Sequence, residues 1–307
     1  MYQPPSPLRR VILVVADGLR PDAIARFNLV SIRRMMRQGS FTLSATTVTP
    51  SVTAAAMTSL LTGVAPDRHG VRSDSFFVPV SPPDVRPMPK VLAEAGMVSG
   101  AFMRELPRPF HPLAKQLTRR LGLTYTTFSG HNAREILGAF YRHAGSVERG
   151  LTIMHWPDAD QAGHEHGWMS TEYGEAVTRL DDAVGTLMGM MELLYGQDTL
   201  LVFTADHGGG GAHPNRHDSL HALDRTIPIV LAGGSVTPGE LRPRSSILDV
   251  PATILWALGA GIPDSYAGRP FFEPFDKTSG RRALQRTAPQ QSSVVAGSTR
   301  FMEGGAE

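Results

Sequence analysis

Short apolar runs rich in β-branched residues recur along this chain and restrict its fold more than any other feature. Such runs are typical of strands buried on both faces, as in a parallel sheet. Helical patterns separate the runs, and the clearest has apolar residues at spacings of three and four. This alternation predicts an α/β fold with a mostly parallel central sheet and helices on both faces. We expect strands at residues 11–16, 98–103, 151–155, 199–204 and, more weakly, 227–232, and helices at 24–36 and 171–194.

Length and composition fit one large domain. The chain has 307 residues, of which 41% are hydrophobic and 19% charged, as in ordinary globular proteins. We expect a single domain at residues 11–275, after a polar, proline-rich lead-in at 1–10. Residues 104–150 carry several arginines and are a candidate lid or insert over the sheet. Residues 276–307 are rich in Ser, Gln, Gly and Arg, and we expect a flexible tail there.

Several classes of protein are excluded by what the sequence lacks. Cysteine is absent, which excludes a disulfide scaffold, a Cys-based zinc finger, an iron–sulfur cluster and a Cys nucleophile. A net charge of +2 without a polybasic run is not the footprint of a nucleic-acid binder. No apolar run approaches the ~20 residues of a membrane span, and residues 11–16 are too few for a signal-peptide core. We therefore expect a cytoplasmic protein; the sequence does not predict its oligomeric state.

Acidic and histidine side chains follow three of the expected strands. The carboxyl ends of parallel strands meet at one edge of a sheet, so we expect these side chains to lie close together. Carboxylate and imidazole are the usual ligands of zinc or manganese where thiolates are absent. The residues concerned are Asp17 after the first strand, Asp160 and His164 after the third, and Asp206 and His207 after the fourth.

The number of candidate ligands allows two metal ions. Asp17, Asp206 and His207 make one set of ligands. Asp160 and His164 begin a second set, which needs one more ligand. Two ions about 4 Å apart form a clamp suited to in-line displacement at phosphorus. Three downstream histidines are available for the open position, namely His213, His217 and His221.

A nucleophile is expected where small hydroxyl residues enter a helix, within residues 49–63. A hydroxyl there faces backbone N–H groups and the positive end of the helix dipole, which suit an anionic substrate. The alternative is a plain N-cap serine or threonine without a chemical role.

Taken in order, these motifs resemble the alkaline phosphatase superfamily, and specifically its nucleotide pyrophosphatase/phosphodiesterase-like branch. The resemblance covers about residues 9–275 and implies an alkaline phosphatase-like three-layer sandwich. The motifs that carry it are Val14–Arg20, Thr53 with Leu61-Thr62-Gly63, Pro66–Gly70, Asp160-x-x-Gly163-His164, Thr204–Gly208, His217 before Asp224–Pro228, and Asp249–Leu255 leading to Gly268-Arg269-Pro270.

The resemblance implies a role for each site residue. Thr53 would be the nucleophile and a ligand of the first ion, beside Asp17, Asp206 and His207. The second ion would be held by Asp160, His164 and His217. We prefer His217 because it stands ten residues before Ile227, as the family's third ligand does, and His221 is the reserve. We expect zinc, with manganese as the alternative.

The activity implied is a phosphodiesterase or nucleotide pyrophosphatase that works through a phospho-Thr intermediate. The substrate would be a small-molecule phosphate diester or a nucleotide-like molecule. The chain departs from the branch three residues after the nucleophile, where Ala56 replaces the usual Asn. We therefore expect Arg20 or a backbone N–H to bind a phosphoryl oxygen instead.

Other activities are open on the same site. A phosphomonoesterase or a phosphonate hydrolase would use the same metals, and a non-catalytic scaffold is a further alternative. A sulfatase is disfavoured because position 53 is Thr rather than Cys or Ser. A phosphoethanolamine transferase also uses Thr, but the transferases that this chain resembles carry membrane helices, and we expect none here.

Overall fold

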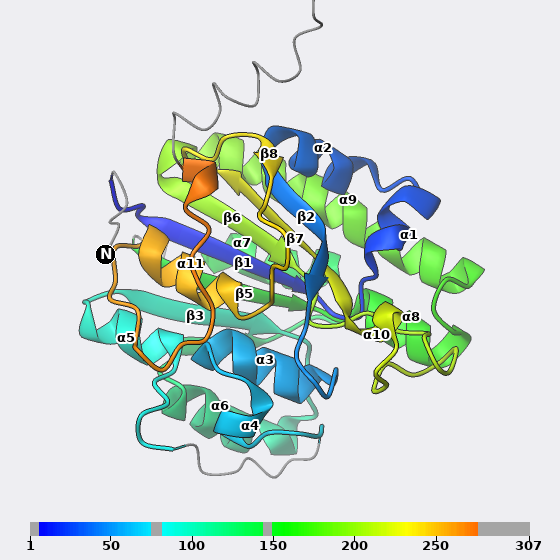
Figure 1. Ribbon diagram of the computed structural model, residues 1–307, viewed down its shortest axis with the longest axis horizontal. Helices are drawn as coiled ribbons and strands as arrows, with labels where there is room; N and C mark the ends of the chain where they lie inside the picture. The colour runs from blue at the N-terminus through cyan, green and yellow to red at the C-terminus, as the bar shows by residue number, and fades with distance from the viewer. Residues whose placement is uncertain (1–5, 75–81, 144–148, 276–307) are drawn as a thin grey trace, which may run out of the picture.

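A computed structural model describes residues 6–74, 82–143 and 149–275 (Figure 1). Its centre is an eight-stranded sheet with the order β4-β3-β5-β1-β6-β7-β2-β8. All of its strands run in the same direction except β7, which is antiparallel to both of its neighbours. The strands are β1 (Arg10–Ala16), β2 (Ser40–Thr46), β3 (Val98–Met103), β4 (Tyr125–Phe128), β5 (Gly150–Trp156), β6 (Thr199–Thr204), β7 (Thr226–Gly233) and β8 (Gly239–Glu240).

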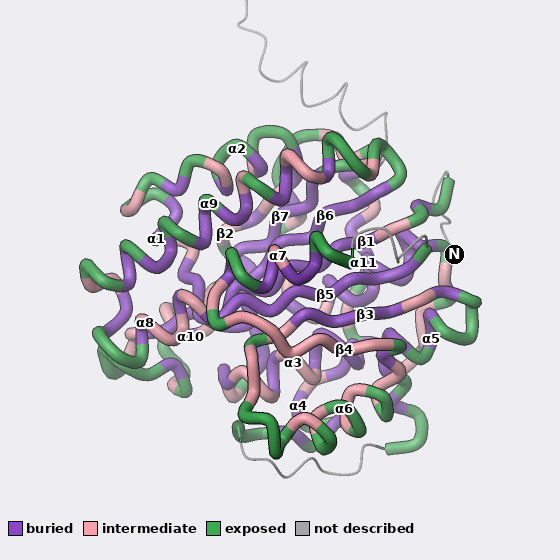
Figure 2. Tube along the Cα trace, turned by 180° about the vertical axis from the view of Figure 1, so that it is seen from behind, coloured by how far each residue is buried: buried purple, intermediate pink, exposed green. Residues whose placement is uncertain are grey.

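Helices cover both faces of the sheet, as the sequence predicts (Figures 1 and 2). One layer contains α2, α9 and α7, which contact one another in that order, and α1 beside them. The opposite layer contains α3, α5 and α11, which also contact one another. The helices are α1 (Pro21–Arg26), α2 (Val30–Gln38), α3 (Thr53–Thr62), α4 (Pro66–His69), α5 (Met88–Glu94), α6 (His111–Arg120), α7 (Ala133–His143), α8 (Asp158–His166), α9 (Thr171–Leu194), α10 (Ala222–Arg225) and α11 (Asp249–Ala257).

The core lies along the three central strands. Every residue of β5 and β6 is buried, and so is every residue of β1 after Arg10 (Figure 2). These strands are the continuous apolar runs of the sequence, which only a sheet covered on both faces can bury. The predicted strands at 98–103 and 199–204 and the predicted helix at 171–194 are confirmed at those bounds. The Ser170 hydroxyl caps this helix by accepting a hydrogen bond from the Tyr173 N–H at 3.1 Å.

The single helix predicted at residues 24–36 is wrong. The chain forms α1 and α2 instead, and Asn28 between them has a left-handed φ of 49°. The break is stabilised by Asp181 on α9, whose carboxylate accepts hydrogen bonds from Ser31 N at 2.9 Å and Ile32 N at 2.8 Å. Those N–H groups would otherwise lack partners in the first turn of α2. A tertiary cap of this kind has no local sequence signal.

Residues 104–150 are built into the fold, at least over the part that the structure describes. Tyr125–Phe128 is the edge strand β4, paired with β3, and α7 packs on β5, β3 and α9. The expected tail at 276–307 and residues 1–5 of the lead-in lie outside the described residues. None of the described helices is long and apolar enough to cross a membrane.

Candidate metal centre and nucleophile

Adjacent strand ends bring the predicted ligands together. β1 lies between β5 and β6, with Ala16 opposite Trp156 and Val15 opposite Thr204. Asp17 follows β1 directly, Asp206 follows β6 after one residue, and Asp160 lies in the first turn of α8 after β5. The Asp160 N–H donates to the Asp17 carbonyl oxygen at 2.9 Å, which ties α8 to the end of β1.

Gly18 makes this close approach of α8 and β1 possible. It has a left-handed φ of 68°, and an added Cβ would lie 2.8 Å from the Cα of Asp160. Its N–H donates to Asp206 Oδ1 at 3.2 Å, while its carbonyl accepts from Trp168 Nε1 at 2.8 Å and from the Tyr173 hydroxyl at 3.1 Å. The backbone of Gly18 therefore connects the end of β1 to Asp206, Trp168 and Tyr173.

The loop between β6 and β7 supplies two histidines. Buried Asp224 shapes it by accepting hydrogen bonds from Gly211 N at 2.8 Å and the Ser219 hydroxyl at 2.5 Å. His217 is fixed from the other side, where Ser51 makes two contacts with it. Its Nδ1 lies 2.7 Å from the Ser51 carbonyl oxygen, and the Ser51 hydroxyl donates to the His217 carbonyl oxygen.

Thr53 is the first residue of α3, two residues after Ser51. Its Oγ1 lies 3.1 Å from His207 Nε2 and 3.5 Å from Asp17 Oδ1. The structure thus places the predicted nucleophile at a helix start and against the predicted ligands of the first ion.

All three histidines of the cluster present the same nitrogen to it. Nδ1 of His207 faces the Gly208 carbonyl oxygen at 2.8 Å, and Nδ1 of His164 faces that of Asn215 at 2.9 Å. His217 uses the Ser51 carbonyl in the same way. A proton on Nδ1 satisfies each carbonyl and leaves the Nε2 lone pair directed at the carboxylates, which is the tautomer that binds a metal.

The separations between ligand atoms match those around one metal ion. His207 Nε2 lies 3.2 Å from Asp17 Oδ1 and 3.5 Å from Asp206 Oδ2. Asp160 Oδ1 lies 3.4 Å from His164 Nε2 and 3.7 Å from His217 Nε2. Ligands about 2.0–2.1 Å from a tetrahedral zinc ion would be about 3.4 Å apart. Two groups of three residues have ligand atoms that all lie within 4.8 Å of one another inside the group. The first group is Asp17, Asp206 and His207, and the second is Asp160, His207 and His217.

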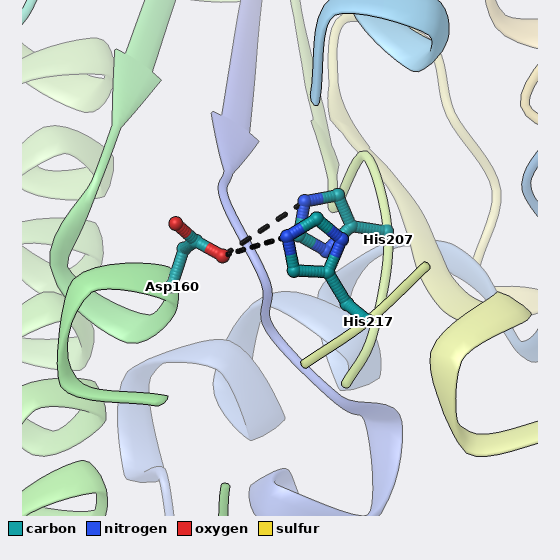
Figure 3. A group of neighbouring side chains, drawn as sticks. All are labelled: Asp160, His207 and His217. Atoms are coloured by element: carbon teal, nitrogen blue, oxygen red, sulfur yellow. Dashed lines mark ion pairs between the residues drawn. The ribbon is translucent and has the colours of Figure 1, made fainter. Parts of the chain in front are cut away.

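Figure 3 shows the second of these sets, in which Asp160 faces two imidazoles. The rings of His207 and His217 are stacked with their centroids 3.7 Å apart. Nε2 of His164 lies only 3.1 Å from Nε2 of His217. Two unprotonated nitrogens at that separation repel each other unless a cation lies between them. His207 also lies 3.9 Å from Asp160 Oδ1, so it connects the two predicted sets of ligands.

The buried carboxylates create a strong demand for positive charge. Burial raises the pKa of Asp17 well above its ordinary value, and the carboxylates of Asp206 and Asp160 raise it further. Burial alone would lower the pKa of His207, but Asp206, Asp17 and Asp160 raise it to about 10. The pKa of His217 is lowered by burial and by His207. Without a metal ion, a proton on His207 offsets part of the negative charge of the three carboxylates. A divalent ion carries twice that positive charge and would offset more of it.

Buried polar atoms without hydrogen-bond partners lie at the same place. Asp160 Oδ1, Asp206 Oδ2 and His155 Nε2 are buried and have no hydrogen-bond partner in the described structure. His155 ends β5 and lies 3.4 Å from Asp17 Oδ2. A cavity of about 290 Å³ opens beside these atoms, lined in part by Asp17, His155 and Asp160, with Arg104 on its wall. Unsatisfied buried acceptors beside an open cavity fit a metal site.

The structure also shows the surroundings of Arg20 and Ala56, two residues that the sequence analysis singled out. Arg20 is buried, and its guanidinium already has partners. It pairs with Asp22 at 2.6 Å and donates to the Gly209 carbonyl at 3.2 Å. Its predicted part in substrate binding stays a prediction, which these contacts do not support. Ala56 lies fully buried in the hydrophobic core, so an amide at that position would face the core rather than the substrate.

Of the histidines left open by the sequence, only His217 joins the cluster. His221 caps α10 by accepting a hydrogen bond from Leu223 N, and His213 is exposed. Sequence reasoning missed Ser51, Trp168 and Asp224 as positioning residues. Ser51 and Trp168 act on partners distant in the sequence, and Asp224 acts by shaping a loop that has no regular secondary structure. Sequence reasoning also missed Asp74, whose carboxylate accepts a hydrogen bond from the N–H of Ala54 at 2.8 Å.

Two curated proteins are similar to more than half of this chain. Human GPI ethanolamine phosphate transferase 1 is 26% identical over 267 residues, which cover 76% of this chain and 27% of the relative. Rat ectonucleotide pyrophosphatase/phosphodiesterase family member 1 is 25% identical over 223 residues, covering 64% and 24%. The chain thus spans about a quarter of the length of these curated relatives.

The fold and the family agree with the predicted resemblance. A solved structure of a protein in the alkaline phosphatase superfamily from Vibrio parahaemolyticus superposes with a TM-score of 0.67 at 16% identity, covering 87% of this chain and 70% of that one. The family model described as type I phosphodiesterase/nucleotide pyrophosphatase matches residues 11–246. The chain therefore belongs to the type I phosphodiesterase/nucleotide pyrophosphatase family, whose members act on phosphoric ester bonds.

Proposed function

We propose that this chain hydrolyses small-molecule phosphate diesters, including nucleotide-like ones, with Thr53 as nucleophile and two divalent metal ions. The observation that carries the proposal is the position of the Thr53 hydroxyl, 3.1 Å from His207 Nε2 and 3.5 Å from Asp17 Oδ1 at the start of α3. Family membership supports the reaction class. The name of the rat relative supports a nucleotide-like substrate.

Two ions fit the residues present. The first would be held by Asp17, Asp206 and His207 together with Thr53, and the second by Asp160, His164 and His217. The support is the spacing of the ligand atoms, the shared Nδ1 anchoring of the histidines and the carboxylate oxygens that lack a hydrogen bond. Oxygen and imidazole donors without thiolate favour zinc, with manganese as the alternative.

When bound, such ions would lower the pKa of the hydroxyl and withdraw charge from the phosphoryl oxygens. The chain's own residues then carry the reaction. Thr53 Oγ1 attacks phosphorus in line, and the bond from phosphorus to the leaving oxygen breaks as a phospho-Thr53 ester forms. Water next attacks that ester from the side the leaving group vacated, and Thr53 regains its hydroxyl.

The surrounding residues keep Thr53 in place for both displacements. Its position at the first turn of α3 directs the positive end of the helix dipole toward the phosphoryl group. The paired contacts between Ser51 and His217 fix the segment just before Thr53 against the loop that carries the ligands. Both attacks therefore start from a preorganised geometry rather than from a mobile loop.

A second candidate function is transfer of a phosphoethanolamine group. The similarity to human GPI ethanolamine phosphate transferase 1 over 76% of this chain favours it. The first displacement would be the same, and an acceptor hydroxyl would replace water in the second. A monoesterase, a phosphonate hydrolase and a non-catalytic scaffold remain outcomes of the test below.

The test is a side-by-side assay of bis-p-nitrophenyl phosphate and p-nitrophenyl phosphate with zinc- or manganese-loaded protein. Thr53→Ala should abolish diester turnover, while Thr58→Ala, on the same helix, should retain it. Metal content by mass spectrometry should be two ions per chain in the wild type. Mass analysis of acid-quenched protein should show a phosphoryl adduct on the peptide that contains Thr53.

Each other outcome points elsewhere. A Thr53→Ala variant as active as the wild type would refute the nucleophile. A preference for the monoester would change the substrate class to phosphatase, and release of product only with an added alcohol would indicate a transferase. Inactive protein with two ions bound would direct the search to phosphonates, whereas inactive, metal-free protein would favour the scaffold.

A further inference from the structure

We infer that Asp74 sets the charge of the substrate that the nucleophile accepts, an inference that rests on the function proposed above. The observation is one contact beside Thr53. The N–H of Ala54, the residue after the nucleophile, donates to Asp74 Oδ1 at 2.8 Å. Asp74 thereby admits a singly charged phosphate diester and disfavours a doubly charged monoester.

The N–H of Ala54 is a natural place for a phosphoryl oxygen. N–H groups in the first turn of a helix have no partner within the helix and bind anions. α3 has ten residues, and its N-cap, Val52, has no side chain that could accept from them. A carboxylate from twenty residues further along the chain takes this N–H instead. The N–H of the residue after the nucleophile is thus already paired with a negative charge.

No positive charge neutralises Asp74 in the described part of the chain. Arg72 is close in sequence, but its guanidinium pairs with Asp67 at 2.5 Å. Arg68, on the same segment, pairs with Asp84. Apart from the metal ions proposed above, only solvent and salt therefore reduce the effect of the Asp74 charge on the substrate.

A second observation supports the same conclusion. Ala56, where the family's amide was expected, is fully buried in the core and offers no donor at the nucleophile. Arg20 cannot compensate, because Asp22 and the Gly209 carbonyl occupy its guanidinium. On the nucleophile's side of the site, the described residues therefore present a carboxylate where a second phosphoryl charge would need a donor.

The test uses two substrates with the same leaving group and different charge. Methyl p-nitrophenyl phosphate carries one negative charge at pH 8, and p-nitrophenyl phosphate carries two. Asp74→Asn keeps a side-chain oxygen that can accept from Ala54 N and removes the charge. We expect its ratio of monoester to diester kcat/KM to be about tenfold above that of the wild type, since a nearby unit charge is worth roughly one decade.

A binding measurement stands beside turnover. The Kd for inorganic phosphate, measured by calorimetry on the metal-loaded protein, should fall about tenfold in Asp74→Asn. The difference should shrink in 0.5 M NaCl because the carboxylate is exposed. Asp182→Asn is the control: it removes an exposed carboxylate from α9, in the helix layer opposite α3, and should change neither the ratio nor the Kd.

An unchanged ratio with an unchanged phosphate Kd in Asp74→Asn would overturn the inference, and so would an equal effect of Asp182→Asn. Failure of the proposed function looks different. If the wild type turns over neither ester, the hydrolase proposal fails. The phosphate Kd of the two variants then still decides whether Asp74 acts by charge.

Discussion

Replacing Gly18 by Ala should damage the fold and the second metal site together. An alanine at φ 68° is strained, and its Cβ would lie 2.8 Å from the Cα and 3.1 Å from the N of Asp160. Both atoms belong to the backbone of α8, so no side-chain rotation can relieve the contact. The start of α8, which carries the Asp160 carboxylate, must move.

The size of the effect can be worked out in two parts. The left-handed conformation costs an alanine about 1 kcal/mol relative to glycine. Ordinary contact begins near 3.4 Å, so the backbone must open by about 0.6 Å, and overpacking of this kind costs about 1–3 kcal/mol. We expect a loss of about 2–4 kcal/mol in the free energy of unfolding. Displacement of Asp160 should weaken the second ion about 10- to 100-fold.

Gly96 provides the matched control. Its φ is 73°, nearly that of Gly18, but an added Cβ meets no atom within 4 Å. Gly96→Ala therefore carries the backbone strain without the collision and should lose only about 1 kcal/mol. Urea unfolding of both variants in the presence of a chelator isolates the fold, and zinc titration of the refolded proteins isolates the site.

Two results would refute this reasoning. One is an equal loss of stability in Gly18→Ala and Gly96→Ala, which would mean that α8 can move away from the added Cβ without a loss in the free energy of unfolding. The other is an unchanged affinity for the second ion in Gly18→Ala, which would mean that Asp160 does not depend on the close approach of α8 to β1.

Three further predictions concern stability and metal affinity. Burial lowers the pKa of His69 to about 4, whereas a histidine in the unfolded chain has a pKa of about 6.5. As the pH drops, the unfolded chain therefore binds a proton at His69 before the folded chain does, and the free energy of unfolding falls. Between pH 7.5 and pH 5 the wild type should lose about 2 kcal/mol relative to His69→Gln in urea unfolding; parallel pH curves would contradict this. Ser51→Ala leaves the buried His217 carbonyl without its hydrogen-bond donor, so the free energy of unfolding should fall by about 1–2 kcal/mol. Zinc binding measured by calorimetry should also weaken, and a zinc Kd equal to that of the wild type would exclude the positioning role. Chelation should lower Tm and zinc should restore it, because each ion at a hundredfold excess over Kd adds about 2.7 kcal/mol; a Tm insensitive to both would argue against resident metals.

Local chemistry explains why much of the fold was predictable. The strands that became β1, β3, β5 and β6 are continuous apolar runs, and only burial on both faces suits them. β2 and β4 gave no such signal: the first alternates with Ser and Thr, and the second is a half-buried edge strand of four residues. The weak run at 227–232 was recognised as a strand, but its antiparallel direction follows from a connection that starts and ends at the same edge of the sheet.

The sequence by itself determined the types of the site residues and the strands that carry them. Asp17, Asp206 and His207 lie within three residues of the ends of buried strands, so their meeting at one sheet edge required no knowledge of long-range packing. The sequence did not determine which histidine completes the site, or what holds Thr53 in place. Those depend on contacts between segments far apart in the chain, such as Ser51 with His217.

Only the tertiary structure decided the electrostatic character of the site. Arg20 precedes a helix, where a free cation was expected, yet Asp22 and a distant carbonyl take up its guanidinium. Asp74 showed no motif, yet it lies against the N–H that follows the nucleophile. Local sequence sets which groups a strand or helix offers, whereas the energy of a charge depends on every group packed around it. That environment exists only once the chain has folded.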